Sequence, residues 1–319
     1  MIIIGPDQYH SIGNPTDDEY QIWDHLNGFD INFRNCILTD LNRKSTACRT
    51  SIKTEYFLSD EIKSLYPNLI LQFDRNKYKE SHCAPVMFEY TQHPPLTFER
   101  FLCSFNVKPH VGRQLLVSIL HKFGLWDNDI STKHFVSSKQ SIDQHLRFLC
   151  GNKDRLYSKF FSTDMEFLSC KIMPGNYVKR IDLAPIQEDL EFLVPKITRS
   201  FIHLVSETVS ETYLPFMTEK FLFSVISRGL FLSYAPPGWH KILSAKLGFR
   251  LYDNLFDYGF DSIINPVERL VALISMINKF KYLSCHDWHD LYLMEQDAIE
   301  YNYDHYFSGN YSKILDQIA

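Results

Sequence analysis

The chain has 319 residues, of which 45% are hydrophobic and 22% charged, and it contains 14 Pro and 12 Gly. This composition excludes a disordered, collagen-like or coiled-coil protein, and the length favours two domains. The net charge of −5, from 33 Lys and Arg against 38 Asp and Glu, argues against an overall polyanion-binding surface but allows a local basic patch.

No membrane span or secretion signal is predicted. The apolar start at residues 1–4 breaks at Gly5-Pro6, and no apolar run approaches the ~20 residues that a membrane-spanning helix needs. The seven cysteines are scattered without a Cys-x-x-Cys pair, so neither a disulfide framework nor a zinc site is expected. We therefore expect a cytoplasmic protein with no membrane span.

The first 97 residues are irregular and predict a small α/β unit. The predicted elements are strands at residues 2–4, 35–39, 68–73 and 85–90 and a helix at 60–66. His93-Pro94-Pro95 then breaks the chain, because the residue before a proline is driven out of the helical region. We place a domain boundary after this break and expect residues 1–97 to form an N-terminal α/β domain.

Strand and helix signals alternate more strongly from residue 98 to about 280. Strands are predicted at 101–105, 133–136, 199–205 and 230–234, and helices at 111–124, 141–168, 218–227, 239–247 and 266–279. This alternation predicts an open parallel sheet covered by helices, in which ligands bind at the carboxyl ends of the strands. The segment from Cys285 onward is expected to be a terminal helix packed over the domain junction, so that the second domain spans 98–319.

The segment 205–220 carries the strongest chemical signal. A strand ends, a polar loop follows, and a helix opens with Thr218 as N-cap, then Glu219 and Lys220. The N–H groups of the helix start together with Lys220 could hold a phosphate, and Glu219 could accept hydrogen bonds from ribose hydroxyls. The same pattern also fits an ordinary helix start with exposed charges.

Short motifs accompany this segment in a fixed order. They are Phe101-Leu102-Cys103-Ser104-Phe105-Asn106, Arg113, Phe216-Met217-Thr218-Glu219-Lys220, Leu230-Phe231-Leu232, Pro236-Pro237-Gly238, Leu247-Gly248-Phe249, Asp257-Tyr258-Gly259-Phe260-Asp261 and Asn265-Pro266-Val267-Glu268-Arg269. Together they resemble the donor-binding half of GT-B glycosyltransferases, in particular the alpha-1,3-fucosyltransferase family and related bacterial and viral proteins. The resemblance covers about residues 98–280. It implies an α/β fold of the GT-B type, with two Rossmann-like domains whose parallel sheets face each other across a cleft.

The resemblance implies a nucleotide-sugar donor, such as a UDP- or GDP-sugar, in the second domain. Glu219 would hold the ribose, and Lys220 and Arg113 would neutralise the diphosphate that leaves when the glycosidic bond breaks. Thr218 would cap the helix, and Glu207 would approach the sugar or the ribose. Asn106 and His110, after the first strand of this domain, would face the same cleft. The resemblance further implies that no metal is needed, because GT-B enzymes generally work without one.

The stereochemical outcome stays open. Ser-Glu-Thr occurs twice, at 206–208 and 210–212, so either Glu207 or Glu211 could match the family's glutamate. Glu211 and Glu219 also have the spacing of the two-glutamate motif of retaining GT-B enzymes, whereas fucosyltransferases invert. An inverting enzyme needs a general base, and the candidates in the first 97 residues are Asp7, His10 and Glu89. Each of these three also fits a surface or capping residue.

The sequence therefore predicts a metal-independent hexosyl- or pentosyltransferase, with the acceptor on the side of residues 1–97. One alternative is a phage-type transferase that acts on hydroxymethylated pyrimidines in DNA, in the host cytoplasm. A basic stretch at residues 31–53, with Arg43 and Lys44 at its centre, would contact the phosphates, although it also fits a solvated loop. The other alternative is a non-catalytic nucleotide-binding protein with a degenerate GT-B fold. The acceptor and the oligomeric state are left open.

Two further features complete these expectations. Tyr9, Tyr234, Trp239 and Tyr258 fall at predicted loop ends, where a sugar could stack on them. His286 and His289 have the i, i+3 spacing that a metal could use, but no third ligand is suggested, and an amphipathic terminal segment explains them better.

Overall fold

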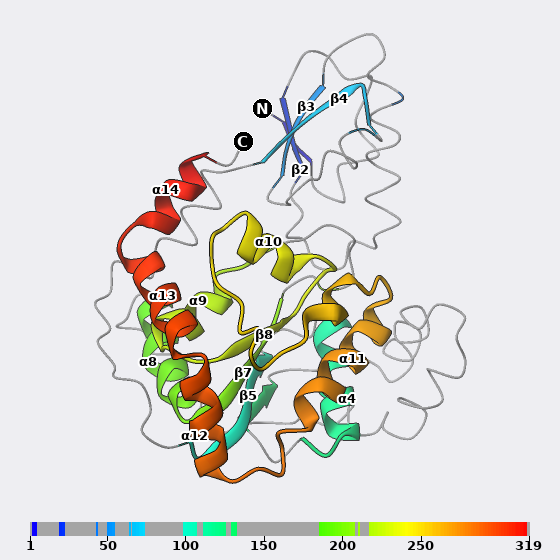
Figure 1. Ribbon diagram of the computed structural model, residues 1–319. Helices are drawn as coiled ribbons and strands as arrows, with labels where there is room; N and C mark the ends of the chain where they lie inside the picture. Colours follow the sequence, from blue (N-terminus) through cyan, green and yellow to red (C-terminus); the bar gives the residue numbers. More distant parts are fainter. Residues whose placement is uncertain are drawn as a thin grey trace.

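The computed structural model describes residues 2–4, 19–22, 43, 50–54, 64, 66–73, 98–106, 111–125, 129–132, 185–207, 210 and 217–317. Within these ranges the protein is an α/β protein with two sheets, each of four parallel strands (Figure 1). The strands of one sheet all precede residue 97 and those of the other all follow it. The α/β class and the parallel pairing agree with the sequence analysis, while the domain boundary itself stays a prediction.

The first sheet contains β1 (Ile2–Ile4), β2 (Glu19–Ile22), β3 (Thr50–Thr54) and β4 (Leu69–Phe73) in the order β1-β2-β3-β4. The predictions at 2–4 and 68–73 are confirmed. The strands β2 and β3 were not predicted, because Glu-Tyr-Gln-Ile and Thr-Ser-Ile-Lys-Thr contain few apolar residues. The predicted strands at 35–39 and 85–90 lie outside the described residues.

The second sheet contains β5 (Arg100–Asn106), β6 (Asp129–Thr132), β7 (Ser200–Ser206) and β8 (Phe231–Tyr234) in the order β6-β5-β7-β8. The chain first moves from β5 to β6 in one direction and then from β7 to β8 in the other. Parallel crossovers are almost always right-handed, so this reversal requires the connecting helices to lie on opposite faces.

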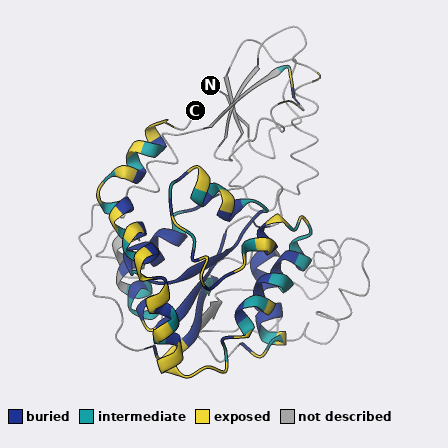
Figure 2. Ribbon diagram, viewed as in Figure 1, coloured by how far each residue is buried: buried dark blue, intermediate teal, exposed yellow. Residues whose placement is uncertain are grey.

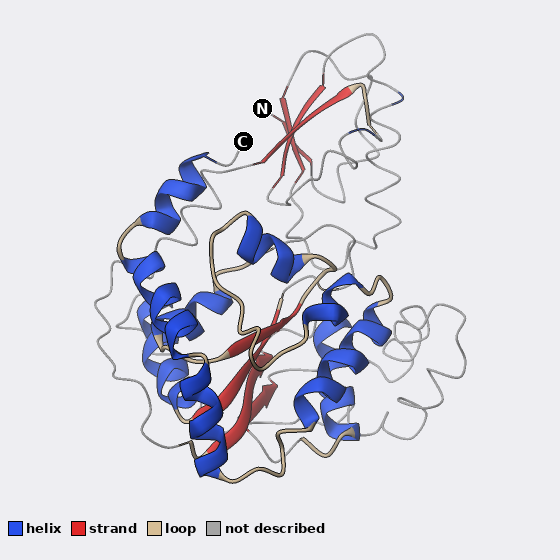
Figure 3. Cartoon of the chain, viewed as in Figure 1, coloured by secondary structure: helices blue, strands red, loops and turns tan. Residues whose placement is uncertain are grey.

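The observed helices satisfy this requirement (Figures 1 and 3). On one face, α4 (Val111–Lys122), which connects β5 to β6, packs against α11 (Pro266–Asn278). On the other face, α8 (Pro185–Thr198) and α9 (Lys220–Ile226) pack against each other and against β7. The second sheet is therefore doubly wound, and its strand order reverses between β5 and β7. Ligands of such sheets bind outside the carboxyl ends of the strands at this reversal.

Local signals explain where several helices start and stop. Asn265 caps α11, and its Oδ1 accepts hydrogen bonds from Val267 N and Glu268 N, both at 3.0 Å. Gly124 and Gly248 follow α4 and α10 (Trp239–Ala245) with φ of 65° and 78°, a left-handed conformation that glycine adopts without strain. These boundaries agree with the predicted ones.

Some elements of the structure were not predicted or differ from their predicted form. The strand predicted at 133–136 lies outside the described residues, and the edge strand β6 at Asp129–Thr132, which has a weak hydrophobic pattern, was not predicted. The helix α9 begins at Lys220, with Glu219 rather than Thr218 at its N-cap position. The terminal segment is not one helix but three, α12 (Cys285–Met294), α13 (Gln296–Phe307) and α14 (Asn310–Gln317). The predicted helices at 60–66 and 141–168 lie almost wholly outside the described residues.

In the described part of the chain the terminal helices contact the second sheet and its helices, through α12 on β7 and α13 on α9, while their expected packing over the domain junction stays a prediction. Trp288 of α12 stacks on Phe201 of β7 with 7° between the ring planes, and Phe280 and Phe98 meet the same Phe201 ring edge-on. These rings are all buried, with Phe201 near the amino-terminal end of β7. Figure 2 shows that β5, β7 and β8 are buried along most of their length. Burial also lowers the pKa of His203, in the middle of β7, to about 3, so this core histidine is neutral.

A second contact joins the terminal helices to the turn between α9 and β8. Arg228 in this turn forms an ion pair of 2.9 Å with Glu300 and lies over the ring of Tyr303, while its carbonyl accepts a hydrogen bond from the Tyr292 hydroxyl. Arg228 has φ of 51°, an unfavourable value for a residue with a side chain. The contacts with α12 and α13 offset this local strain.

None of the helices in the described ranges combines the length and the apolar character that crossing a membrane requires.

Candidate functional site

Three polar residues meet where the order of the second sheet reverses. Asn106 is the last residue of β5, Ser206 is the last residue of β7, and Glu207 follows directly. The two strands are neighbours, and their register pairs Cys103 with His203, three residues before the two strand ends. All three residues are buried. The carboxyl end of the sheet at the reversal is therefore polar although it is covered.

Glu207 is bound to the segment that opens α9. Its two carboxylate oxygens accept hydrogen bonds from Thr218 N at 3.1 and 3.2 Å, and the Thr218 hydroxyl donates to Oε2 at 2.6 Å. Lys220 Nζ in turn donates to the Thr218 hydroxyl at 3.1 Å. These contacts form a connected network from the end of β7 through Thr218 to Lys220, and Thr218 is tied to Glu207 rather than acting as a simple helix cap.

This network changes the expected role of Glu207. The resemblance implied that its carboxylate approaches a sugar or a ribose, whereas in the structure both oxygens contact Thr218. Glu207 thereby holds the Thr218-Glu219-Lys220 segment against the end of β7. Glu219 and Lys220 are half-buried, so they are the members of the segment that border solvent.

Burial raises the pKa of Glu207 above its usual value, and the positive charge of Lys220 and the hydrogen bonds from Thr218 only partly offset this. The native state therefore binds this proton more readily than the unfolded chain does. Because the folded pKa is the higher one, the stability that Glu207 contributes falls as the pH rises through the window between the two values. At neutral pH the buried carboxylate is a cost to folding.

We expect Glu207→Gln to raise the free energy of unfolding at pH 7 by about 1 kcal/mol, because the amide keeps an acceptor for Thr218 N without a buried charge. Urea denaturation between pH 4 and pH 7 measures this, and the advantage of the variant should shrink as the pH falls. The matched control is Glu99→Gln, since Glu99 is exposed and its ion pair with Arg199 is long, at 3.8 Å. A variant less stable than the native chain at pH 7 would contradict this prediction.

Arg113 lies in the first turn of α4, the helix that follows β5, and only 3% of it is exposed. Arginine stays charged inside proteins, so Arg113 brings a permanent positive charge to the helix that begins at this edge. Asn106, Arg113, Glu207, Thr218, Glu219 and Lys220 thus all lie on elements that begin or end at the carboxyl edge of β5 and β7. The sequence prediction assigned all six to one site.

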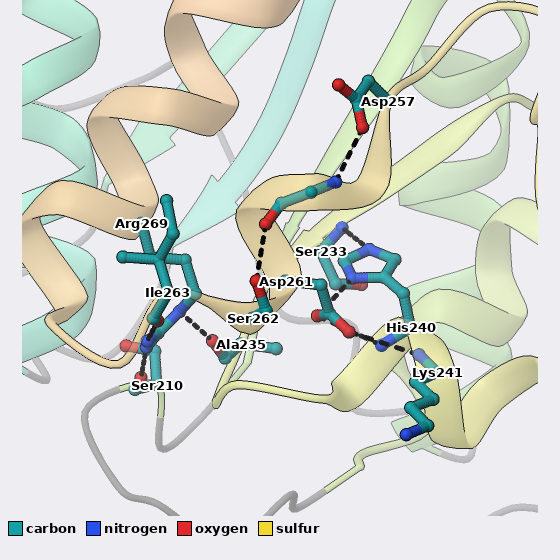
Figure 4. A network of polar contacts seen from close by, with 11 residues as sticks. Ser210, Ser233, Ala235, His240, Lys241, Asp257, Asp261, Ser262, Ile263 and Arg269 are labelled. Atoms are coloured by element: carbon teal, nitrogen blue, oxygen red, sulfur yellow. Dashed lines mark hydrogen bonds and ion pairs between the residues drawn. The ribbon is translucent and has the colours of Figure 1, made fainter.

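Arg269 of α11 is a site residue that the sequence analysis missed. Its buried guanidinium donates to Ala235 O at 2.9 Å and to Ile263 O at 2.6 Å (Figure 4). It also donates to Ile264 O at 3.0 Å. A further N–H donates to Ser210 O. One side chain therefore joins the chain after β7, the chain after β8 and the approach to α11. The Asn265-Pro266 start signal places Arg269 in the helix, but nothing local predicts these partners.

A second missed group is His240 with Asp261 (Figure 4). His240 Nδ1 lies 2.9 Å from Asp261 Oδ1, and His240 Nε2 accepts from Ser233 N at 3.2 Å. Because a backbone N–H can only donate, Nε2 carries no proton and Nδ1–H donates to the carboxylate. Asp261 also accepts from the backbone N of His240 and of Lys241, so it caps α10 from a distance. The pair anchors the loop after β8.

The prediction that Tyr234 and Trp239 are placed to stack on a sugar is wrong. Tyr234 and Trp239 are both fully buried, with Tyr234 under α11 and Trp239 edge-on to Phe221 of α9. Tyr258 packs against His240 and its hydroxyl accepts from Tyr252 N. Their positions at strand and loop ends suggested exposure, but these loops fold back over the sheet.

Other predicted residues lie outside the described part of the chain. They are Asp7, His10, Tyr9, Glu89, His110 and Glu211, together with most of the basic stretch at 31–53. Of that stretch, Arg43 is described and exposed. Among the described residues, no group of three or more His, Cys, Asp or Glu side chains could hold a metal ion, and His286 forms only a long contact of 3.8 Å with Asp290.

The geometry of the site is a doubly wound parallel sheet with a polar, partly cationic edge at the reversal of its strand order. Comparison with protein-family models, with curated proteins and with solved structures finds no match for this chain.

Proposed function

We propose that the protein is a glycosyltransferase that takes a hexosyl or pentosyl group from a nucleotide-sugar and binds this donor at the carboxyl ends of β5 and β7. The observation that supports the proposal is the Glu207–Thr218–Lys220 network beside the reversal of the strand order. Doubly wound sheets bind nucleotides at this place. The order of motifs from Phe101 to Arg269 resembles the donor half of GT-B glycosyltransferases, which supports glycosyl transfer over other nucleotide chemistry.

The chemistry of the proposed reaction requires stabilisation of a leaving nucleoside diphosphate. Negative charge develops on the diphosphate as the glycosidic bond breaks, and fixed cations at that point lower the barrier. Lys220 and Arg113 are the cations that the proposal assigns to this role, so no metal ion is needed. Glu219 would accept hydrogen bonds from the ribose, and Glu207 would act as a positioning residue that holds Thr218 and Lys220.

The acceptor side of the proposal belongs to residues 1–97, arranged as the first of two Rossmann-like domains across a cleft. A base from this part of the chain would take the proton of the acceptor hydroxyl, with Asp7, His10 and Glu89 as candidates. The acceptor would be a glycan or a modified DNA base.

The first test is a thermal-shift panel of UDP, GDP, ADP and CDP. A matching nucleotide at about 100 times its Kd should raise the Tm by about 5 °C or more, because it binds only the folded state. Lys220→Ala should abolish this shift, since the cation beside the diphosphate is lost. Lys246→Ala is the matched control, because Lys246 is an exposed residue at the end of α10.

Two outcomes would count against the proposal. No shift with any of the four nucleotides in the native chain would exclude a nucleotide site. Glycosyltransferases slowly transfer the donor sugar to water when no acceptor is present. A rise in Tm with a nucleotide, but no hydrolysis of any nucleotide-sugar during a long incubation, would therefore indicate a nucleotide-binding protein without transferase activity.

A further inference from the structure

Two buried polar atoms lie at the reversal of the sheet, at the ends of the adjacent strands β5 and β7. Asn106 is 0% exposed and Ser206 is 2% exposed, and neither Asn106 Oδ1 nor Ser206 Oγ has a hydrogen-bond partner among the described residues. The two residues end the adjacent strands β5 and β7, which are still in contact two residues earlier, where Ser104 Oγ donates to Leu204 O. Because side chains alternate along a strand, Asn106 and Ser206 both lie two positions beyond this contact and on the same face of the sheet. Buried polar atoms are rarely left in this state, and each such atom calls for an explanation.

Hydrogen bonding on the sheet sets the orientation of the Asn106 amide. Ser104 Oγ donates its one proton to Leu204 O at 2.8 Å, so it can only accept from Asn106 Nδ2, which lies 3.1 Å away. The nitrogen of the amide therefore faces Ser104, and Oδ1 faces away from it. Oδ1 is thus a preset acceptor, and whatever satisfies it must bring an O–H or an N–H.

This requirement selects the chemistry of the partner. The oxygens of an ionised phosphate have no proton to donate, so Asn106 Oδ1 does not fit the diphosphate. An aliphatic hydroxyl fits both atoms at once, because it donates to Oδ1 and accepts from the Ser206 hydroxyl. A buried water could make the same two hydrogen bonds. A sugar hydroxyl and a water are therefore the two occupants to separate.

We propose that Asn106 and Ser206 bind a hydroxyl group of the donor's sugar part, either on the ribose or on the transferred sugar. The inference rests on the proposed function, and it assigns to this pair the recognition of a hydroxyl rather than of the phosphates. Lys220 and Arg113 bind the charged diphosphate of the ligand. Asn106 and Ser206 add specificity through neutral hydrogen bonds to a hydroxyl.

The test is Ser206→Ala, with affinities measured by calorimetry. Since the Ser206 hydroxyl has no described partner, its removal should leave the Tm of the free protein unchanged or higher. The affinity for the hydroxyl-bearing ligand should fall about 3- to 10-fold. Ser118→Ala is the matched control, because Ser118 is also a buried serine but its hydroxyl bonds to Gln114 O within α4, at 2.7 Å.

The ligands separate the two sources of the hydroxyl. If the pair binds the ribose, Ser206→Ala lowers the affinity for the nucleoside diphosphate but not the affinity for its 2′-deoxy or 3′-deoxy form. If the pair binds the transferred sugar, Ser206→Ala lowers only the affinity for the nucleotide-sugar. Asn106→Leu should reproduce the same ligand pattern.

Two results overturn the inference in different ways. Equal affinities of Ser206→Ala and the native chain for every ligand would assign the two atoms to a buried water and leave the proposed function standing. Absence of binding of any nucleotide or nucleotide-sugar to the native chain would overturn the proposed function and this inference together.

Discussion

Arg269→Met should lower the free energy of unfolding by about 3–5 kcal/mol, the cost of breaking a buried charged contact. Arg269 is 1% exposed, and its guanidinium donates to the carbonyls of Ser210, Ala235, Ile263 and Ile264. Methionine fills much of the volume but offers no donor, so these carbonyls lose their charge-assisted hydrogen bonds. Urea denaturation followed by circular dichroism measures the loss.

Two further variants make the Arg269 prediction specific. Arg269→Lys should recover only part of the loss, because an ammonium group cannot present the planar fork that reaches three segments at once. Arg199→Met should change the free energy of unfolding by less than about 0.5 kcal/mol, since Arg199 is 62% exposed in its side chain. A loss below 1 kcal/mol for Arg269→Met would show that the carbonyls find other donors and that Arg269 does not hold the loops.

Phe201→Ala should lower the free energy of unfolding by about 3–5 kcal/mol through the loss of buried area and the cavity that remains. Phe201 is 0% exposed, stacks on Trp288 of α12 at a centroid distance of 6.0 Å, and meets Phe98 and Phe280 edge-on. The ring lies between the sheet and α12, so the cavity weakens the attachment of the terminal helices. Hydrogen exchange should therefore speed up in α12 more than in β8.

The Phe201 prediction carries its own controls. Phe201→Leu should lower the free energy of unfolding less than Phe201→Ala does, because leucine keeps most of the apolar volume. Tyr282→Ala should leave the free energy of unfolding almost unchanged, because Tyr282 is 84% exposed. In the double variant with Trp288→Ala the two losses should not add, since each substitution removes part of the same contact. Additive losses would mean that α12 does not depend on this ring pair.

Local sequence signals predicted many element boundaries. The Asn265-Pro266 pair marks the start of α11, and Gly124 and Gly248 mark helix ends, because each acts through backbone geometry within a few residues. The buried strands β5, β7 and β8 were also predicted, since a strand covered on both faces is apolar along its whole length. The edge strand β6 lacks that pattern and was not predicted.

The site was predictable only where its residues follow strand ends. Asn106, Glu207 and Lys220 could be assigned to one edge because the carboxyl ends of parallel strands lie together. Arg269, His240 and Asp261 could not be assigned from the sequence, because their partners lie far away in the chain. Arg269 donates to Ser210 O and Ala235 O, and His240 pairs with Asp261, which is 21 residues later. A charged residue in a helix pattern gives no indication that it is buried.

The amino-acid pattern alone was sufficient for the α/β class, the parallel pairing and the grouping of polar residues at strand ends, because periodicity and turn chemistry act over short distances. The order β6-β5-β7-β8 needed the folded chain, since strand order depends on crossovers between segments many residues apart. That order places β5, which ends at Asn106, beside β7, which ends at Ser206. The contact of Glu207 with Thr218 likewise arises only when the end of β7 and the start of α9 pack together, because burial leaves the carboxylate no water to bind.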